Sequence, residues 1–390
     1  MQIGLILLCL AYVLSQFFRA FLAVLSGVLE NDLGTTPEDL AFASSLWFLS
    51  FAAMQLPVGW ALDRIGPRRT ASVLLLIGGG GGALLFAMAT SAAHINLAML
   101  LIGIGSSPVL MASYYIFARE YPPVKFATLA ALMLGVGSVG NLVASYPMAL
   151  AAETIGWRAS LAGLALTSAI VALGVHQTVK DPKAIEGETK GSVLDILKMP
   201  VMWAILPLMF VNYTPAGGLR GLWIGPYLSD VFGLSTAQIG QATLVMGAAM
   251  ITGTLVLGPM DRIFKTRKWV VLAVNFAGVL TMLALVLQID RSVILSVTLI
   301  CLIGLFGVSY PVMMAHGRSF FPAHLVGRGV TLMNLFSIGG VGIMQFASGH
   351  IHTRFADGDP SAPYVAIFTF FGVALLIGAL IYLFSRDSVD

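Results

Sequence analysis

Charged side chains are scarce in this sequence: only 10% of its 390 residues are Asp, Glu, Lys or Arg, against about 25% in a soluble domain. Hydrophobic residues make up 58% of the chain. The net charge of +3 is too small to favour nucleic acid as a partner. This composition excludes a soluble domain and predicts an integral membrane protein.

Cysteine is also nearly absent, since the chain has only Cys9 and Cys301. Both lie in apolar runs, so no disulfide framework is expected. The N-terminus lacks the basic segment and the small-residue cleavage site of a signal peptide, so we expect the apolar run from Ile3 onward to be retained as a membrane helix.

No phosphate-binding loop is present, which argues against a protein driven by ATP. The segment GVGSVG at 135–140 has the glycine spacing of a dinucleotide site, but it lies in an apolar stretch and follows no strand. We interpret these glycines, and the run at 78–82, as helix-packing residues. No catalytic constellation stands out, so we expect no cofactor, no metal and no enzyme activity.

Long apolar stretches, by contrast, fill the chain. Windows of about 20 apolar residues predict twelve membrane helices, and the short alternating segments of a membrane barrel are missing. The expected fold is therefore an all-α integral membrane protein. The predicted spans are approximately 3–29, 40–62, 70–90, 94–118, 124–151, 158–178, 199–228, 237–260, 269–288, 292–316, 326–349 and 362–385.

Basic residues in the loops predict the orientation. With the N-terminus inside, most of the 21 lysines and arginines fall on the cytoplasmic side, as the positive-inside rule requires. Both termini are then cytoplasmic. Compact loops and short tails favour the bacterial inner membrane, and we expect a monomer.

The sequence predicts a chain built from two copies of one unit. A polar stretch at 179–198 separates six predicted spans in 1–178 from six in 199–390. Segments recur in order at an offset of about 200 residues, which indicates a duplication. The matches are DRIGPRR at 63–69 with DRIFKTRK at 261–268, PVLMAS at 108–113 with PVMMAH at 311–316, Thr128-Leu129 with Thr331-Leu332, and Ala144-Ser145 with Ala347-Ser348.

Two arginines belong to the same series and lie inside apolar stretches. An unpaired charge at Arg19 or Arg220 would cost at least a few kcal/mol in the membrane. Tyr12 and Tyr213 each precede their arginine by seven residues, which is two turns of a regular helix and the same face. All 18 acidic residues can be placed at predicted helix ends, so no buried carboxylate is left for an ion pair. A guanidinium suits carboxylate or phosphate oxygens, and the pair predicts an anion-binding site.

The loop sequence GWALDRIGPRR at 59–69 resembles the signature between helices 2 and 3 of the major facilitator superfamily. The second copy is degenerate, because Phe264 stands where Gly66 is. This resemblance, with the duplication, covers the whole chain. It implies a secondary transporter with pseudo-two-fold symmetry about the membrane normal and a substrate site between the halves near the midplane.

Helices 1, 4, 7 and 10 usually line the cavity in that family, so Arg19 and Arg220 would face each other. The arrangement is similar to that of its organic-phosphate antiporters. Nitrate carriers instead place arginines on helices 2 and 8, which carry none in the core here. We therefore expect a small organic anion, a carboxylate or an organic phosphate, moved by alternating access.

Further residues complete the expected machinery. Polar and aromatic side chains on the cavity-lining helices are the remaining candidates for binding substrate: Tyr12, Gln16, Tyr114, Tyr115, Tyr213, Trp223 and Tyr310. The recurring acidic and basic residues after helices 2 and 8 are expected to act as a gate, with a carboxylate accepting hydrogen bonds from a helix N-terminus: Asp63, Arg64, Arg68, Asp261 and Arg262.

Coupling and substrate class stay open at this stage. His316 on helix 10 could carry a coupling proton, or it could be a polar residue at a helix end. Met246, Met250, Met313 and His316 could carry Cu(I) in a metal importer, although Met is a common gap-filler. An exporter of amphipathic drugs is the other alternative, since aromatic and Met side chains form adaptable pockets.

Overall fold

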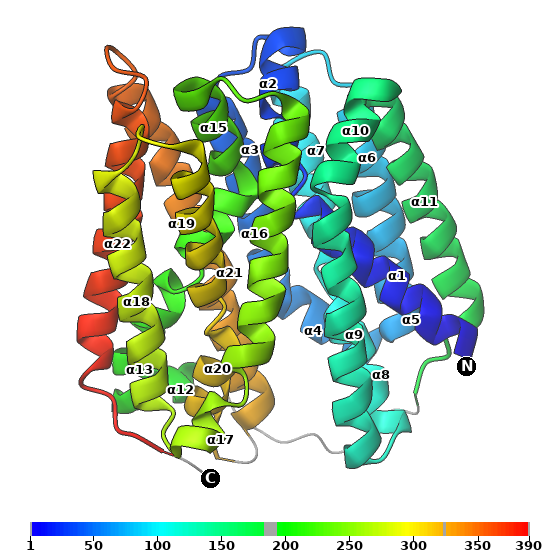
Figure 1. The fold of residues 1–390 in the computed structure, drawn as a ribbon. Helices are drawn as coiled ribbons and strands as arrows, with labels where there is room; N and C mark the ends of the chain where they lie inside the picture. The colour runs from blue at the N-terminus through cyan, green and yellow to red at the C-terminus, as the bar shows by residue number, and fades with distance from the viewer. Residues whose placement is uncertain (1, 183–192, 323–324, 389–390) are drawn as a thin grey trace. The chain divides into compact units, whose positions relative to one another are not determined.

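A computed structural model describes residues 2–182, 193–322 and 325–388 (Figure 1). The described residues form helices joined by turns and loops, with no strand among them. The chain divides into two compact units, Met1–Glu186 with Ser235–Gln241 and Gly187–Leu234 with Ala242–Asp390. The division falls within the polar stretch at 179–198, of which residues 183–192 lie outside the described part.

The first unit contains α1 (Gln2–Phe18), α2 (Leu22–Leu33), α3 (Pro37–Ala53), α4 (Gln55–Arg64), α5 (Pro67–Leu74), the π-helix η1 (Leu75–Gly81), α6 (Gly82–Ala87), α7 (Ala92–Ser106), α8 (Pro108–Glu120), α9 (Pro123–Val143), α10 (Tyr146–Thr154) and α11 (Trp157–Thr178). The second contains α12 (Val193–Leu197), α13 (Pro200–Val211), α14 (Thr214–Gly218), the π-helix η2 (Leu219–Trp223), α15 (Ile224–Phe232), α17 (Met260–Phe264), α18 (Lys268–Leu287), α19 (Val293–Phe306), α20 (Tyr310–Arg318), α21 (Val326–Arg354) and α22 (Ala362–Tyr382). Helix α16 (Thr236–Leu257) begins in the first unit and continues in the second.

The described residues include 9 helices long and apolar enough to cross a membrane, or up to 11 if each of two bent pairs is one span. The bent pairs are Ile3–Phe18 with Leu22–Leu33, at 53°, and Pro37–Ala53 with Gln55–Arg64, at 40°. The stretch predicted as a span at 199–228 is helical but divided into α13, α14, η2 and α15. The total of twelve spans stays a prediction.

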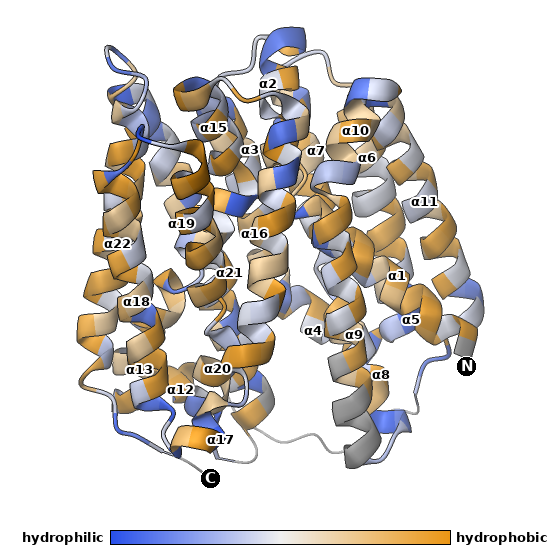
Figure 2. Ribbon diagram, viewed as in Figure 1, coloured by the Kyte–Doolittle hydropathy of each residue, from blue (hydrophilic) through white to orange (hydrophobic). Residues whose placement is uncertain are grey.

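Apolar stripes on the helix surfaces match a lipid environment. On α11, Leu166, Ile170 and Leu173 are each more than half exposed, and on α18 so are Leu280 and Leu283. Figure 2 shows hydrophobic residues along the length of both helices. Spacings of three and four residues put such side chains on one helix face, and in water that face would be costly.

Close helix packing depends on glycine in both units, at positions 200 residues apart. A Cβ on Gly140 of α9 would lie 2.0 Å from the carbonyl oxygen of Val13 on α1. A Cβ on Gly340 of α21 would lie 1.9 Å from that of Phe210 on α13. Small residues let helix backbones approach in membranes, where packing replaces the hydrophobic effect between helices.

Candidate functional site

Arg19 lies in a break of its membrane helix. Helix α1 ends at Phe18 and α2 begins at Leu22, so Arg19 is in the turn between them. Its guanidinium carbon lies 5.2 Å from the ring centre of Trp47 and 5.7 Å from that of Phe51, both on α3. The Nε atom is buried without a hydrogen-bond partner, and within the described part of the chain no carboxylate pairs with this side chain. Aromatic faces attract the cation but do not neutralise it.

Arg220 lies in the π-helix η2 and is only 3% exposed. Its Nη1 donates a hydrogen bond of 2.6 Å to the carbonyl oxygen of Thr243 on α16. One turn further along α16, a Cβ on Gly247 would lie 3.1 Å from Nη1 and Nη2. The missing side chain at Gly247 therefore leaves the space in which the guanidinium rests against the helix. Single-turn π-helices are rare and occur often at functional sites.

The same-face argument for the tyrosines is wrong for the second pair, because Tyr213 lies in the turn between α13 and α14 and Arg220 lies in η2. In the first unit α1 is regular from Tyr12 to Phe18, and Arg19 is the first residue of the break that follows. Pro215 has no N–H to continue the α13 hydrogen-bond ladder, which accounts for the second break. Tyr12 packs on Gly137 of α9, where a Cβ would lie 2.2 Å from its Cδ1 atom, and the Tyr213 ring packs on Gly217.

The other predicted binding residues have different surroundings. Gln16 is half-buried, and its Oε1 has no hydrogen-bond partner. Tyr310 donates from its hydroxyl to Oδ1 of Asn334, at 3.1 Å. Trp223 is fully buried inside the second unit, where its Nε1 donates to the hydroxyl of Ser348 at 2.8 Å. Its indole therefore attaches η2 to α21.

Tyr114 and Tyr115 lie on α8 and are half-buried. The Tyr114 ring centre is 6.4 Å from that of Phe117, on the same helix. The guanidinium carbon of Arg119 lies 4.1 Å from the ring centre of Tyr115. Arg119 in turn pairs with Asp63 of the predicted gate.

The expected carboxylate at a helix N-terminus is present in the first unit, but it is Asp181 rather than Asp63. Asp181 Oδ1 accepts a hydrogen bond of 2.8 Å from the backbone N–H of Arg68 at the start of α5, and its Oδ2 lies 3.6 Å from Arg68 Nε. Asp63 instead pairs with Arg119, at 3.9 Å, and Arg64 is exposed. Gly66 is required here: its φ is +95° and a Cβ would lie 2.6 Å from Asp181 Oδ1.

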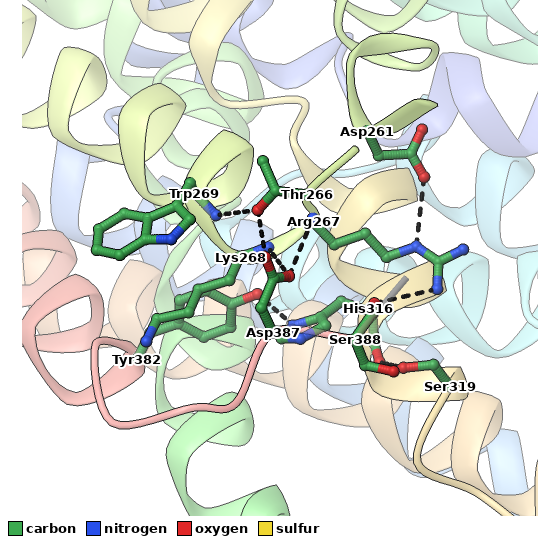
Figure 3. Close-up of polar contacts among 10 residues, drawn as sticks. All are labelled: Asp261, Thr266, Arg267, Lys268, Trp269, His316, Ser319, Tyr382, Asp387 and Ser388. Carbon is green, nitrogen blue, oxygen red and sulfur yellow. Dashed lines mark hydrogen bonds and ion pairs between the residues drawn. The ribbon is translucent and has the colours of Figure 1, made fainter. Parts of the chain in front are cut away.

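The second unit repeats this arrangement with Asp387 (Figure 3). Asp387 Oδ1 accepts from the backbone N–H groups of Arg267 and Lys268, at 3.2 and 3.0 Å, and its Oδ2 accepts from the Thr266 hydroxyl. Asp181 and Asp387 were not singled out from the sequence. A signal existed, since Lys180-Asp181 and Arg386-Asp387 follow the last helix of each unit at an offset of about 200 residues.

Asp261 has a partner that the sequence analysis did not identify. Its Oδ2 lies 3.3 Å from Nε of Arg267, and both side chains are largely buried. Arg267 Nη1 also donates to the carbonyl oxygen of Ser388, at 3.4 Å. Arg262, the other residue predicted for this part of the gate, is exposed.

His316 belongs to the same cluster (Figure 3). It is fully buried, with Nε2 at 2.9 Å from the carbonyl oxygen of Arg386 and Nδ1 at 2.5 Å from the hydroxyl of Tyr382. A carbonyl can only accept, so Nε2 carries a proton and Nδ1 accepts from Tyr382 in the neutral imidazole. Both nitrogens are thus occupied by the C-terminal segment and α22.

The four residues of the copper alternative make three separate sets of contacts. Met246 and Met250 pack against Gly304 of α19. The Met313 sulfur accepts a hydrogen bond of 3.1 Å from Nδ2 of Asn212. With His316 bonded to Tyr382, the structure favours the interpretation of these methionines as packing residues.

Replacing Asp387 by asparagine is expected to lower stability by about 1 kcal/mol or less, the cost of an exposed N-cap. Burial alone would raise the pKa of the Asp387 carboxyl, but hydrogen bonds from Thr266 and from the amides of Lys268 and Arg267 outweigh it and lower the pKa. A depressed carboxyl pKa contributes stability above the ordinary value near 4, and this contribution is lost as the pH falls through the folded-state value.

Melting curves of purified protein at pH 7 and at about pH 3 would measure this effect. The melting temperature of the variant should be lower at pH 7, and the difference should shrink at acid pH. Asp357→Asn is the charge-matched control, since Asp357 is exposed in a loop. An equal loss at both pH values would contradict the assignment of Asp387 as a cap.

Comparison with known proteins agrees with the helical architecture. The sequence profile of the Major Facilitator Superfamily matches residues 8–341 and 209–390. The chain is 30% identical over 67 residues to the "probable sulfoacetate transporter SauU" of Cupriavidus necator, a match that spans only 17% of this chain and 16% of that protein. It is 22% identical over 97% of its length to the "uncharacterized transporter YybO" of Bacillus subtilis, covering 92% of that protein.

A solved structure shares the fold along nearly the whole chain. The crystal structure of a bacterial homolog of the human lysosomal transporter Spinster, in an inward-facing and occupied conformation, matches with a TM-score of 0.81 and 17% identity, over 98% of this chain and 96% of that one. At this identity the likeness concerns the fold. With the profile match over most of the sequence and the membrane-spanning helices, these findings show that the chain belongs to the major facilitator superfamily and is a multi-pass membrane transporter, not an enzyme.

Proposed function

We propose that this protein is a secondary transporter of a small organic anion, which Arg19 and Arg220 bind during alternating access. The observation that carries the proposal is the state of Arg19. Its guanidinium lies at the break of a bent pair of apolar helices, on two aromatic rings and with no paired carboxylate among the described residues. Irregular backbone at membrane depth is tolerated where it is buried in protein or lines a wet cavity, and a charge there is commonly functional.

Arg220 supports the proposal through its own geometry. It too lies in irregular helix, in the first membrane stretch of the second half of the sequence. Its Nη1 donates to a neutral group, the backbone carbonyl of Thr243. A carboxylate, phosphate or sulfonate would be a stronger partner, because it adds an opposite charge and can accept two parallel hydrogen bonds from the guanidinium.

The similarity to a probable sulfoacetate transporter gives a first substrate to test. Sulfoacetate carries a carboxylate and a sulfonate, one anionic group for each arginine. Because a bound anion would neutralise the buried guanidinium of Arg19 while the carrier closes, the proposal includes faster exchange than net flux. It also places both termini in the cytoplasm and the protein in a bacterial inner membrane.

The proposal includes two six-helix halves, 1–178 and 199–390. Recurring structural details support it. Helices α3 and α16 both begin with a capping box, formed by Thr36 with Asp39 and by Ser235 with Gln238. These positions are about 200 residues apart, as are the glycine contacts to α1 and α13.

Thermal stabilisation by anions tests the proposed function. Sulfoacetate and a panel of carboxylates and organic phosphates should raise the melting temperature of purified wild-type protein, since a ligand at 100 times its Kd adds about 2.7 kcal/mol. Arg19→Gln and Arg220→Gln should lose this response. Arg291→Gln, which changes an exposed arginine, should keep it.

The result that would overturn the proposal is equally specific. If both core variants respond to the same anions as the wild type does, the two arginines have a structural role. Stabilisation by lipophilic cations but by no anion would instead favour a drug exporter.

A further inference from the structure

Helix α16 is held at its start by a carboxylate from another helix. Ser235 and Gln238 form a capping box: the Ser235 N–H donates to Oε1 of Gln238 at 2.9 Å, and the Gln238 N–H lies 3.4 Å from Oγ of Ser235. The N–H of Ala237, between them, donates to Oε1 of Glu153 at 3.0 Å. Glu153 is in the last turn of α10, so a negative side chain from α10 meets the positive end of α16.

A second contact joins the same two helices. A Cβ on Gly240 of α16 would lie 2.7 Å from the Cβ of Ala149 and 3.0 Å from the Cα of Tyr146, both on α10. Only glycine permits this approach. Together with the Glu153 hydrogen bond, it explains why Ser235–Gln241 belongs to the same compact unit as α10, although the rest of α16 belongs to the other unit.

Helix α16, whose first turn donates a hydrogen bond to Glu153, also contacts the guanidinium of Arg220. Thr243, whose carbonyl accepts from Arg220, lies six residues after Ala237, or about 9 Å along the axis. Gly247, against which the guanidinium rests, lies one turn further. No Pro interrupts α16 between these points, so a shift at either end is transmitted along a rigid element.

We infer that α16 couples the Arg220 site to the α10 contact, and that Glu153 is a positioning residue of the transport cycle. An anion competes with the Thr243 carbonyl for the guanidinium. When it binds, α16 loses that hydrogen bond, and the Glu153–Ala237 contact is weakened in the same step. This inference deepens the proposed function, since the anion is the competing ligand, but its first test needs no anion.

The test is hydrogen exchange at the Ala237 amide in detergent-solubilised protein, because exchange reports local opening. Gly247→Ala puts a methyl group 3.1 Å from the guanidinium and should push it by a few tenths of an ångström, which weakens its hydrogen bond to Thr243. Ala237 lies about 15 Å from Gly247 along the helix axis. We expect hydrogen exchange at its amide to become about two- to fivefold faster, because the loss of a charge–dipole contact at a helix end has an effect of this size. Thr252→Ala, an exposed position on the same helix, should leave the rate unchanged.

The sign of this change separates coupling from a local effect. Alanine is the better helix former, so a merely structural response to Gly247→Ala would be slower or unchanged exchange. Either of those results would overturn the inference. Glu153→Gln provides the reciprocal measurement: because linkage is reciprocal, weakening the Ala237 contact should tighten sulfoacetate binding, by at most the factor with which sulfoacetate accelerates exchange in the wild type.

The two proposals fail in different ways. If Gly247→Ala accelerates exchange but neither sulfoacetate nor any other anion of the panel has an effect on wild-type protein, the coupling stands and the anion proposal is wrong. If sulfoacetate stabilises the protein but Glu153→Gln binds it with unchanged affinity, the anion proposal stands and the role of Glu153 is wrong. Asp357→Asn serves as the charge-matched control for Glu153→Gln.

Discussion

Arg220→Gln is expected to slow anion exchange in reconstituted vesicles by about 100-fold or more. Truncating one partner of a buried, hydrogen-bonded charge pair typically costs about 2–5 kcal/mol of binding free energy. In the proposed site the guanidinium and the anionic group of the substrate form such a pair. Arg220→Lys should lose less, about tenfold, because it keeps the charge but not the planar fork that fits two oxygens at once.

Loss of the fold should not explain this result. Glutamine ends two bonds short of the Nη1 atom that contacts the Thr243 carbonyl, so that hydrogen bond is lost, but the neutral side chain avoids the cost of a buried ion. Because these two effects oppose each other, the melting temperature without ligand should stay close to that of the wild type. Exchange that persists in Arg220→Gln at more than about a tenth of the wild-type rate would remove Arg220 from the substrate site.

Gly140→Ala is expected to cause the largest loss of stability among conservative substitutions in the first unit. The new Cβ would lie 2.0 Å from the carbonyl oxygen of Val13 and 3.0 Å from the amide nitrogen of Phe17. Both are backbone atoms of α1, so the helix itself must move. Overpacking typically costs about 1–3 kcal/mol, occasionally more, and the displaced helix leads directly to Arg19.

Gly135→Ala on the same helix is the matched control, because nothing lies within 4 Å of its Cβ position. It should be neutral, or stabilising by up to about 1 kcal/mol from helix propensity. Melting temperature and the yield of folded protein would measure both variants. Equal values for Gly140→Ala and Gly135→Ala would show that α1 and α9 do not pack as described.

The glycines at 135–140 illustrate how far sequence reasoning reaches. The missing strand before them excluded a dinucleotide site, and packing against another helix was the correct interpretation for Gly140. Composition could not show which glycines pack, since that depends on which face of α9 meets α1. In the structure Gly137 and Gly140 contact α1, whereas a Cβ on Gly135 would have no neighbour within 4 Å.

The gate shows a different limit. The recurring DR segments located the two loops, but they led to Asp63 as the cap of a helix N-terminus. Asp181 and Asp387 have that role instead, and they reach it from the end of another helix. A periodicity argument relates residues within one helix, whereas this contact joins residues more than 100 positions apart.

Local sequence was sufficient to determine that the chain is helical and spans a membrane, because scarce charge and long apolar runs leave the backbone no other partners in lipid. It also identified the two costly arginines and their repetition. Only the tertiary structure decided that both lie in irregular helix, that aromatic rings hold Arg19, and that Gly247 and the Thr243 carbonyl hold Arg220. The physical reason is that a buried charge is oriented by whatever packs beside it, and those neighbours come from other helices.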